Sequence, residues 1–233
     1  MDDGRISISS DHLQAFWPTP LAILAWQGSP HHEKAKTQAV QFLLYTTGRH
    51  WEKDGQNPVS HNPAIKGWPW ISETHSWIEP TALAIIALDA CDHGHHPRVQ
   101  EAVQLLMDRQ LPHGGWNYGN VTVFGRELRP APESTGAALS ALAGHVHREQ
   151  VRTSLDYLIG EMKTVRTPIA LGWGLHGLRS WGVMPAEAAT KVIHCLSRQE
   201  RYGAYETASL CLLLLSLSAY GGFGRMGQAD SAA

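Results

Sequence analysis

Residues 110–116 read Gln-Leu-Pro-His-Gly-Gly-Trp, and residues 199–205 repeat this heptapeptide in weaker form as Gln-Glu-Arg-Tyr-Gly-Ala-Tyr. Each copy ends one helix-like stretch and precedes a second stretch that is rich in alanine and leucine. A short motif that recurs where helices join is typical of stacked helical hairpins, because each hairpin buries its apolar face only against its neighbours. The motif therefore predicts a helical repeat fold.

Two kinds of apolar segment alternate along the chain. The first kind is rich in alanine and leucine and nearly free of charge, and it predicts buried inner helices at 21–26, 81–90, 135–143, 168–178 and 207–219. The second kind mixes apolar and charged residues at helical spacing, and it predicts amphipathic outer helices at 32–46, 98–110, 148–163 and 185–198. A double layer of helices satisfies both patterns.

The boundaries between these helices carry their own signals. A threonine or proline is expected to mark the start of each inner helix, namely Thr19, Thr81, Thr135, Pro168 and Thr207. Residues 47–75 are polar and broken by proline and glycine, which predicts a long loop of the kind that is usually functional or a lid. Residues 120–124 predict at most a short extended piece. We expect one domain over 1–220 and a disordered tail over 221–233.

Composition excludes some partners. The 233 residues carry a formal net charge of −2, so no overall basic field attracts phosphates, and neither nucleic acid nor anionic lipid is implied as a partner. Cys91, Cys195 and Cys211 lie in or beside apolar runs, which predicts reduced, buried thiols and a cytoplasmic location. Residues 1–7 lack the features of a secretory signal, and no stretch is apolar enough to span a bilayer. Peripheral association with a membrane stays open.

The repeat resembles that of a known family. Gln-x-x-x-Gly-x-Trp followed by a Thr-Ala inner helix resembles the repeats of squalene-hopene and oxidosqualene cyclases, whose helical toroid is shared by protein prenyltransferase β subunits. The resemblance is most specific over 67–142 and recurs over 198–217. It implies an all-α protein, an α/α toroid with about five inner and four outer helices, in which Gln caps a neighbouring helix end and Trp stacks at the junction. Such toroids close with about six hairpins, so the resemblance implies a ring that is open, truncated, or completed by a homo-oligomer or a partner chain.

The resemblance also implies an acid site. These cyclases protonate an alkene with an Asp of an Asp-x-Asp-Asp-Thr-Ala motif, and the segment Trp-Ile-Glu79-Pro-Thr-Ala places Glu79 at the proton-donating position. Glu133 holds a nearly equivalent position in the next hairpin, and Glu206 lies one residue nearer its threonine. We expect the three carboxylates to approach one end of a central cavity, with His75, a helical turn before Glu79, as a partner.

Burial and helix ends give a second interpretation of these glutamates. A single Glu in an apolar pocket has its pKa raised, and the other two acids of the motif are absent here. A Glu at a helix N-terminus is also favoured by the helix dipole and the free N–H groups, so capping alone is the alternative role of all three.

Aromatic residues gather before the predicted inner helices. Trp68, Trp70, Trp77, Tyr118 and Phe124 all do so. Aromatic faces stabilise carbocations, so the resemblance implies that they line the pocket of an isoprenoid substrate. Packing at wide helix junctions is the alternative.

A metal site is not expected. Asp89-Ala-Cys91 and His194 match the letters of the prenyltransferase zinc ligands, but the Asp-Cys pair ends an inner helix instead of beginning one. The His-rich residues 92–96 form a short inter-helix segment whose spacing fits a solvated turn. We therefore expect neither a metal nor another cofactor.

Two functional hypotheses follow. The first is a squalene- or terpene-cyclase-like protein that binds an isoprenoid or other long apolar substrate in a central cavity and performs acid-catalysed cyclisation or isomerisation led by Glu79. The second is a non-catalytic toroid that acts as a binding or assembly module, or as one part of a larger cyclase. Convergence of the carboxylates favours the enzyme, and contact with backbone N–H groups or solvent favours the module.

Overall fold

The computed structural model describes residues 3–53 and 60–218. These residues are mostly helical and include one small two-stranded sheet, which confirms the all-α class. The predicted tail, residues 221–233, lies outside the described residues. None of the helices in the described ranges combines the length and the apolar character that a membrane span requires.

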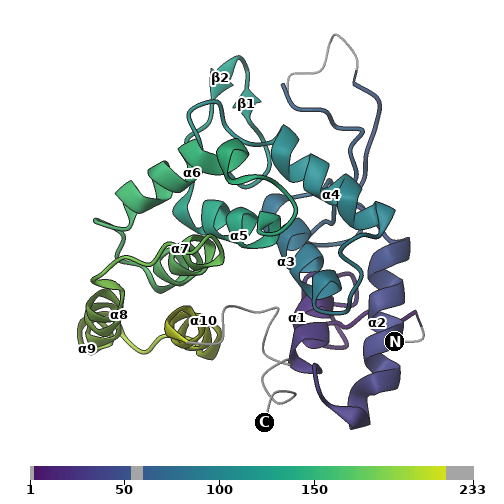
Figure 1. Cartoon of the computed structure of the whole chain (residues 1–233). Helices are drawn as coiled ribbons and strands as arrows, with labels where there is room; N and C mark the ends of the chain where they lie inside the picture. The colour runs from purple at the N-terminus through teal and green to yellow at the C-terminus, as the bar shows by residue number, and fades with distance from the viewer. Residues whose placement is uncertain (1–2, 54–59, 219–233) are drawn as a thin grey trace.

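The inner helices form a continuous row. They are α1 (Pro18–Ala25), α3 (Ile78–Asp89), α5 (Pro132–Leu142), α7 (Pro168–Ser180) and α10 (Thr207–Leu217). Each contacts the next along the chain, and Figure 1 shows them following a curve with α1 and α10 at its two ends. Their buried side chains belong to one apolar cluster that extends from Phe16 to Leu213.

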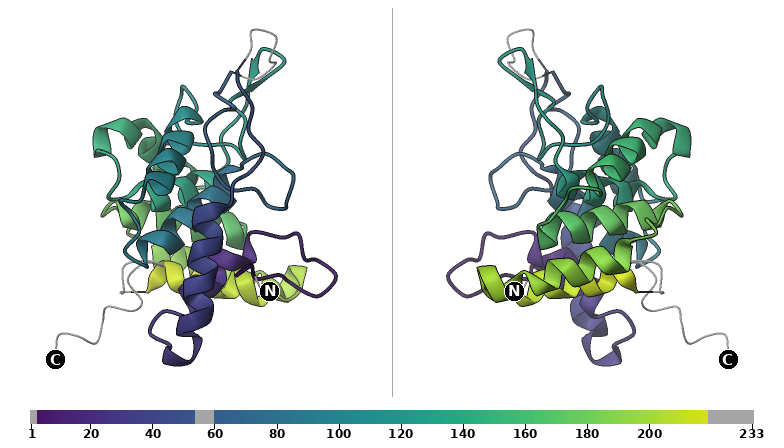
Figure 2. Two further views of the ribbon diagram at one scale, coloured as in Figure 1. Left: turned by 90° about the vertical axis from the view of Figure 1, so that its right-hand side faces the viewer. Right: turned by 90° about the vertical axis from the view of Figure 1, so that its left-hand side faces the viewer.

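The outer helices cover the convex side of this row. They are α2 (Glu33–Tyr45), preceded by the short turn η1 (Pro30–His32), α4 (Pro97–Asp108), α6 (Arg148–Glu161) and α8 (Ala188–Ser197), followed by the short α9 (Gln199–Tyr202). Each of the four long ones packs on an inner helix, and Figure 2 shows the same layers from the sides. The two kinds of predicted helix are therefore confirmed.

Two inner helices begin earlier than predicted. Helices α3 and α5 start one turn before Thr81 and Thr135, because these threonines bond a preceding segment instead of capping a helix. The Trp68 N–H donates to Thr81 Oγ1 over 3.0 Å, and the hydroxyl donates back to the Trp68 carbonyl over 3.3 Å. Trp116 and Thr135 repeat both bonds at 3.0 and 3.3 Å. We call this two-bond arrangement the threonine clamp.

A third threonine clamp joins the N-terminal segment to α1. The Ile6 N–H donates to Thr19 Oγ1 over 3.1 Å, and the hydroxyl donates to the Ile6 carbonyl over 3.4 Å. Gly4 and Gly114 each stand two residues before the clamped residue, with positive φ and packed on the backbone of an outer helix. The N-terminal segment is thus a further copy of the junction, although its sequence lacks the aromatic residue.

The tryptophans of the junction bond helix ends. The indole N–H of Trp68 donates to the Leu43 carbonyl of α2 over 3.0 Å, and that of Trp116 donates to the Leu106 carbonyl of α4 over 2.7 Å. The Tyr205 hydroxyl makes the equivalent bond to the Cys195 carbonyl of α8 over 2.9 Å. These bonds satisfy helix carbonyls that would otherwise lack partners.

The two motif glutamines bond differently, and only Gln199 donates to the end of a neighbouring helix, as the resemblance implies. Gln110 donates to the hydroxyl of Ser154 in α6 over 2.7 Å. Gln199 bonds within its own junction, to the Tyr205 N–H over 2.8 Å and to the Leu196 carbonyl over 3.1 Å. Their amides therefore hold the turn that contains the motif.

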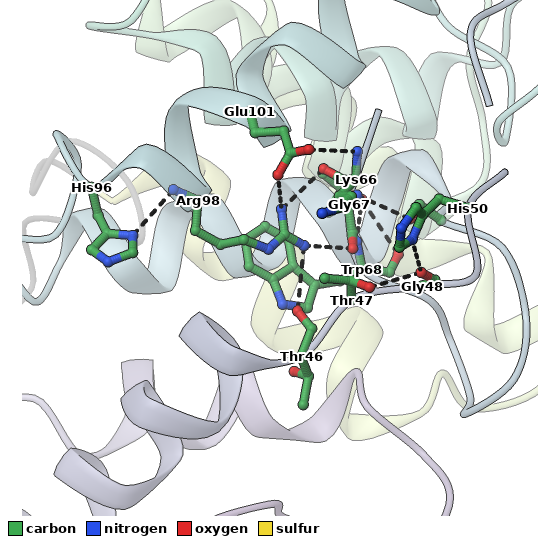
Figure 3. A network of polar contacts seen from close by, with 12 residues as sticks. Thr46, Thr47, Gly48, His50, Lys66, Gly67, Trp68, His96, Arg98 and Glu101 are labelled. Atoms are coloured by element: carbon green, nitrogen blue, oxygen red, sulfur yellow. Dashed lines mark hydrogen bonds and ion pairs between the residues drawn. The ribbon is translucent and has the colours of Figure 1, made fainter. Parts of the chain in front are cut away.

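A buried arginine forms hydrogen bonds to the predicted long loop (Figure 3). No helix occurs in its described parts, 47–53 and 60–75. Arg98 of α4 lies 4.0 Å from the ring centre of Trp68 and donates to the carbonyls of Lys66 and Gly67 over 3.0 and 2.7 Å. Its ion pair with Glu101 spans 3.7 Å. The cation thus ties the loop to α4 and to the junction.

The short extended piece predicted at 120–124 is part of a hairpin. Strands β1 (Thr122–Val123) and β2 (Arg126–Glu127) pair antiparallel, and Phe124 and Gly125 between them both have positive φ. Figures 1 and 2 show the hairpin projecting from the helical body. Phe124 therefore lies at the end of a projection and not in the core.

Candidate functional site

Glu79 is a half-buried acid in the first turn of α3, between the buried Ile78 and Pro80. Burial raises the pKa of Glu79 to about 7, and the negative charge of Glu133 adds to the shift. The expectation that an apolar surrounding raises this pKa is therefore confirmed. Near neutral pH a large share of the Glu79 side chains keeps its proton.

Glu133 occupies the same place in the first turn of α5, which packs directly on α3. The Tyr118 hydroxyl donates to Glu133 Oε1 over 3.0 Å. This bond, followed by the charge of Glu133, raises the pKa of Tyr118, and the charge of Glu79 acts in the same direction. Glu79, Glu133 and Tyr118 form one group, which we call the acid cluster.

The chain between the two helices holds the acid cluster in place. The Ile78 N–H donates to the Tyr118 carbonyl over 2.9 Å, so the segment after Trp116 runs along the start of α3. Gly119 lies against the Trp77 ring, where an added Cβ would come within 3.2 Å of it. Tyr118 is 51% exposed, so solvent reaches the cluster from this side.

His75 lies on the other side of Trp77. His75 precedes the first residue of α3. It therefore does not lie one helical turn before Glu79, as was expected of a partner of that acid. Its ring lies tilted by 35° against that of Trp77, with 4.1 Å between ring centres. Burial, followed by the charge of Arg109, lowers its pKa, and its Nε2 has no hydrogen-bond partner among the described residues.

Glu206 is separate from the acid cluster. It is the exposed residue before α10, and its side chain makes no capping hydrogen bond. Helix α10 is separated from α5 by α7 along the inner row, which explains why its first residues do not reach Glu133. Two of the three expected carboxylates therefore come together.

The five predicted aromatic residues lie in different surroundings. Trp68 is fully buried at its junction, and with Trp17 it borders an apolar crevice too narrow for a water molecule. Trp70 meets Trp17 edge to face at 6.3 Å between ring centres. Phe124, at the end of the hairpin, is 87% exposed. Tyr118 belongs to the acid cluster, and Trp77 directly precedes the helix that carries Glu79.

Buried polar residues near the cluster were not expected from the sequence. Arg109 is 3% exposed and donates to the Ser76 carbonyl, and burial lowers its pKa to about 10. His61 is 6% exposed, and burial followed by the charge of Arg109 lowers its pKa to about 4. Ser134, beside Glu133, is buried with no partner for its hydroxyl among the described residues. Single polar residues in a loop or at a helix end carry no pattern that would have indicated this.

The residues with the letters of a zinc site lie apart. Asp89 Oδ2 bonds His145 Nε2 over 2.8 Å, and Cys91 Sγ accepts from the Gln27 amide over 3.2 Å. His194 is exposed on α8, far along the row from α3. The described ranges hold no group of three or more Asp, Glu, His and Cys side chains that could bind a metal ion. Cys195 is buried, as expected, but Cys211 is exposed on α10, contrary to expectation.

Comparison with known proteins adds no relative. No protein-family model matches the chain, and no curated protein matches it in sequence. The functional argument therefore depends on the geometry of the acid cluster.

Proposed function

We propose that this protein is a terpenoid-cyclase-like acid–base catalyst in which the acid cluster moves a proton on an isoprenoid or other long apolar substrate. The observation that carries the proposal is the pair Glu79 and Glu133, placed alike at the starts of adjacent inner helices, with the pKa of Glu79 near 7. A general acid works best when its pKa lies near the working pH. A second carboxyl beside such an acid supplies a candidate base.

The arrangement of helices supports an incomplete α/α toroid as the fold. The curved inner row, with an outer helix on each of its members, is what one part of such a ring requires. Helices α1 and α10 stand at the two ends of the row. In this proposal a second copy or a partner chain adds the missing hairpins.

The chemistry of the cluster favours isomerisation over cyclisation of the squalene type. An acid with a pKa near 7 is a weak proton donor, and each pKa unit corresponds to about 1.4 kcal/mol of proton affinity. Such an acid suits a double-bond shift in an activated substrate. Glu79 adds a proton at one carbon, and Glu133, held by Tyr118, removes a proton from another, so that the mass of the substrate does not change.

Incubation with polyprenyl and triterpene substrates in D2O tests this proposal. We expect a product of unchanged carbon skeleton that gains deuterium, detected by mass spectrometry. Glu79→Gln should lower turnover by at least a hundredfold, in line with loss of a general acid. Glu206→Gln is the matched control, because it removes a carboxyl from the start of α10 and should leave turnover unchanged. Equal turnover of wild type and Glu79→Gln would remove the acid cluster from the mechanism.

An assembly module is the second candidate function, and helix α10 favours it. Leu214 is 66% exposed, and Cys211 on the same helix is also exposed. An apolar helix that contacts an inner neighbour on one side only can accept another helix on the other. In this case native mass spectrometry should detect a stable oligomer with neither retained substrate nor product.

A further inference from the structure

A groove lined by cations lies at the α8 and α9 end of the molecule, away from the acid cluster. Two cavities of about 210 and 420 Å³ adjoin there, and both are bordered by Arg166, His194 and Arg198. Lys163 and Lys191 border the first cavity, and Arg201 borders the second. We call the six side chains the basic groove. They come from the segment before α7, from α8, and from the turn into and through α9.

Most side chains of the basic groove have no ion pair with a described residue. Neither cavity has an acidic residue in its lining. Lys191 forms an ion pair with Glu187 at 4.0 Å, the outer limit of such a contact, and Arg201 lies 5.3 Å from the ring centre of Tyr202. Arg166 and Arg198 have no ion pair with any described residue.

The two buried arginines of the described residues, Arg98 and Arg109, have other surroundings than the groove arginines. Arg98 and Arg109 each donate to backbone carbonyls inside the helical layers. The whole chain has a net charge of −2, so the gathering of cations at one place does not follow from a basic composition. Like charges held together repel one another, and a multiply charged anion removes that repulsion.

The groove has a firm base. Cys195 is buried beneath it, with its Sγ 3.6 Å from the Arg166 carbonyl, and Tyr205 bonds the Cys195 carbonyl. Tyr205 belongs to the second copy of the heptapeptide, so the repeat junction fixes α8 against the segment that carries Arg166. The backbone segments that carry the groove side chains are therefore held in place before a ligand binds.

We propose that the basic groove binds a phosphate group, either of a soluble phosphorylated molecule or of a lipid headgroup. The planar guanidinium groups of Arg166 and Arg198 suit the paired oxygens of a phosphate, and His194 and Lys191 add further donors. The combined space accepts a diphosphate with part of its organic group. This site uses none of the residues of the acid cluster, so it stands independently of the proposed activity.

Calorimetric titration of the full chain with inorganic diphosphate tests whether the ligand is a soluble phosphorylated molecule. Vesicles of phosphatidylcholine with and without phosphatidylglycerol test the headgroup source by co-sedimentation. The test variant is Arg166→Gln/Arg198→Gln. The matched control is Lys34→Gln/Arg152→Gln, which makes the same change of charge at exposed positions outside the groove. Thermal unfolding should be the same for both, because all four side chains lack ion pairs with described residues.

Whichever of the two probes wild type binds, we expect the groove variant to bind it at least tenfold more weakly than wild type does. The control variant should bind that probe with an affinity within twofold of the wild-type value. Binding of diphosphate identifies a soluble ligand, and binding of phosphatidylglycerol vesicles alone identifies a headgroup. An equal loss in both variants would reduce the effect to general charge attraction and would overturn the proposal. Failure of wild type to bind either probe would overturn it as well.

Discussion

Helix α3 buries every residue from Thr81 to Leu88, whereas the similarly apolar α10 buries only Leu212, Leu213 and Ser216. Helix α3 lies between α1 and α5 and is covered by α4, while α10 contacts α7 and α8. The two helices differ in neighbours more than in composition. In a repeat protein the position along the row decides how much of a helix is buried, because each unit is covered only by adjacent units.

The largest difference in unfolding free energy between the middle of the row and its α10 end should appear when the aromatic residues of the junctions are substituted. Trp116→Ala should cost about 3–5 kcal/mol of unfolding free energy, because it removes a fully buried indole and leaves the Leu106 carbonyl without its donor. Tyr205→Ala at the α10 end should cost about 1–2 kcal/mol, since that residue is only half-buried. Urea unfolding of both variants measures the gap. Equal costs would mean that the end of the row is as well packed as its middle.

Close approach of helices gives the next largest effect. A Cβ on Gly136 would collide with the Trp173 carbonyl of α7, so Gly136→Ala should cost about 2–3 kcal/mol. A Cβ on Gly172 would meet the Leu212 Cγ of α10 at 2.5 Å, and a side chain at the end of the row shifts more easily than a backbone carbonyl between two inner helices. Gly172→Ala should therefore cost less than about 1 kcal/mol. The midpoints of thermal unfolding rank the two, and the reverse order would contradict the comparison.

The acids at the starts of α3 and α10 should differ in their effect on the pH dependence of stability. The folded-state pKa of Glu79 is raised, so the folded chain binds this proton more tightly than the unfolded chain does. Stability is therefore lost as the pH rises from about 4.5 to about 7. Glu79→Gln removes this loss and should gain about 2 kcal/mol over wild type at pH 8, with little gain at pH 4. Urea unfolding at the two pH values measures it. Glu206→Gln serves as the control, and a matching gain in that variant would refute the role of burial.

The smallest effect is expected on the open side of α10. Leu214→Ser should change the stability of the monomer by no more than about 0.5 kcal/mol, because the side chain is 66% exposed. If α10 is an assembly surface, the same substitution should lower the oligomer fraction in native mass spectrometry. A large loss of monomer stability would show that this face is covered within the chain.

The alternation of helices was predictable because it depends on local patterns. Charge-free and amphipathic runs each have the period of a helix, so their positions followed from the residues between Leu21 and Leu217. The clamp on Ile6 was not predictable, since an isolated apolar residue carries no repeat signal. It becomes visible only when Thr19 is seen to bond it.

The candidate site was predictable in part. The positions of Glu79 and Glu133 relative to the following threonines indicated that the two would be alike, and they lie at equivalent places in α3 and α5. The bond from Tyr118 to Glu133 depends on the path of a connecting segment, which no sequence period describes. The exposure of Cys211 likewise depends on which neighbours α10 has.

The threonine clamp has a consequence for how the chain tolerates change. The two hydrogen bonds of a clamp join the threonine hydroxyl to the backbone of one preceding residue. The segment between these two residues is therefore a loop closed at its base, as it is between Trp116 and Thr135. Between Trp116 and Thr135 this loop contains the β1–β2 hairpin, whereas the Ile6 and Trp68 loops contain no such hairpin. The hairpin segment 122–127, outside the buried Val121, is therefore a suitable site for grafting foreign peptides, because its length can vary without altering the helices beneath it.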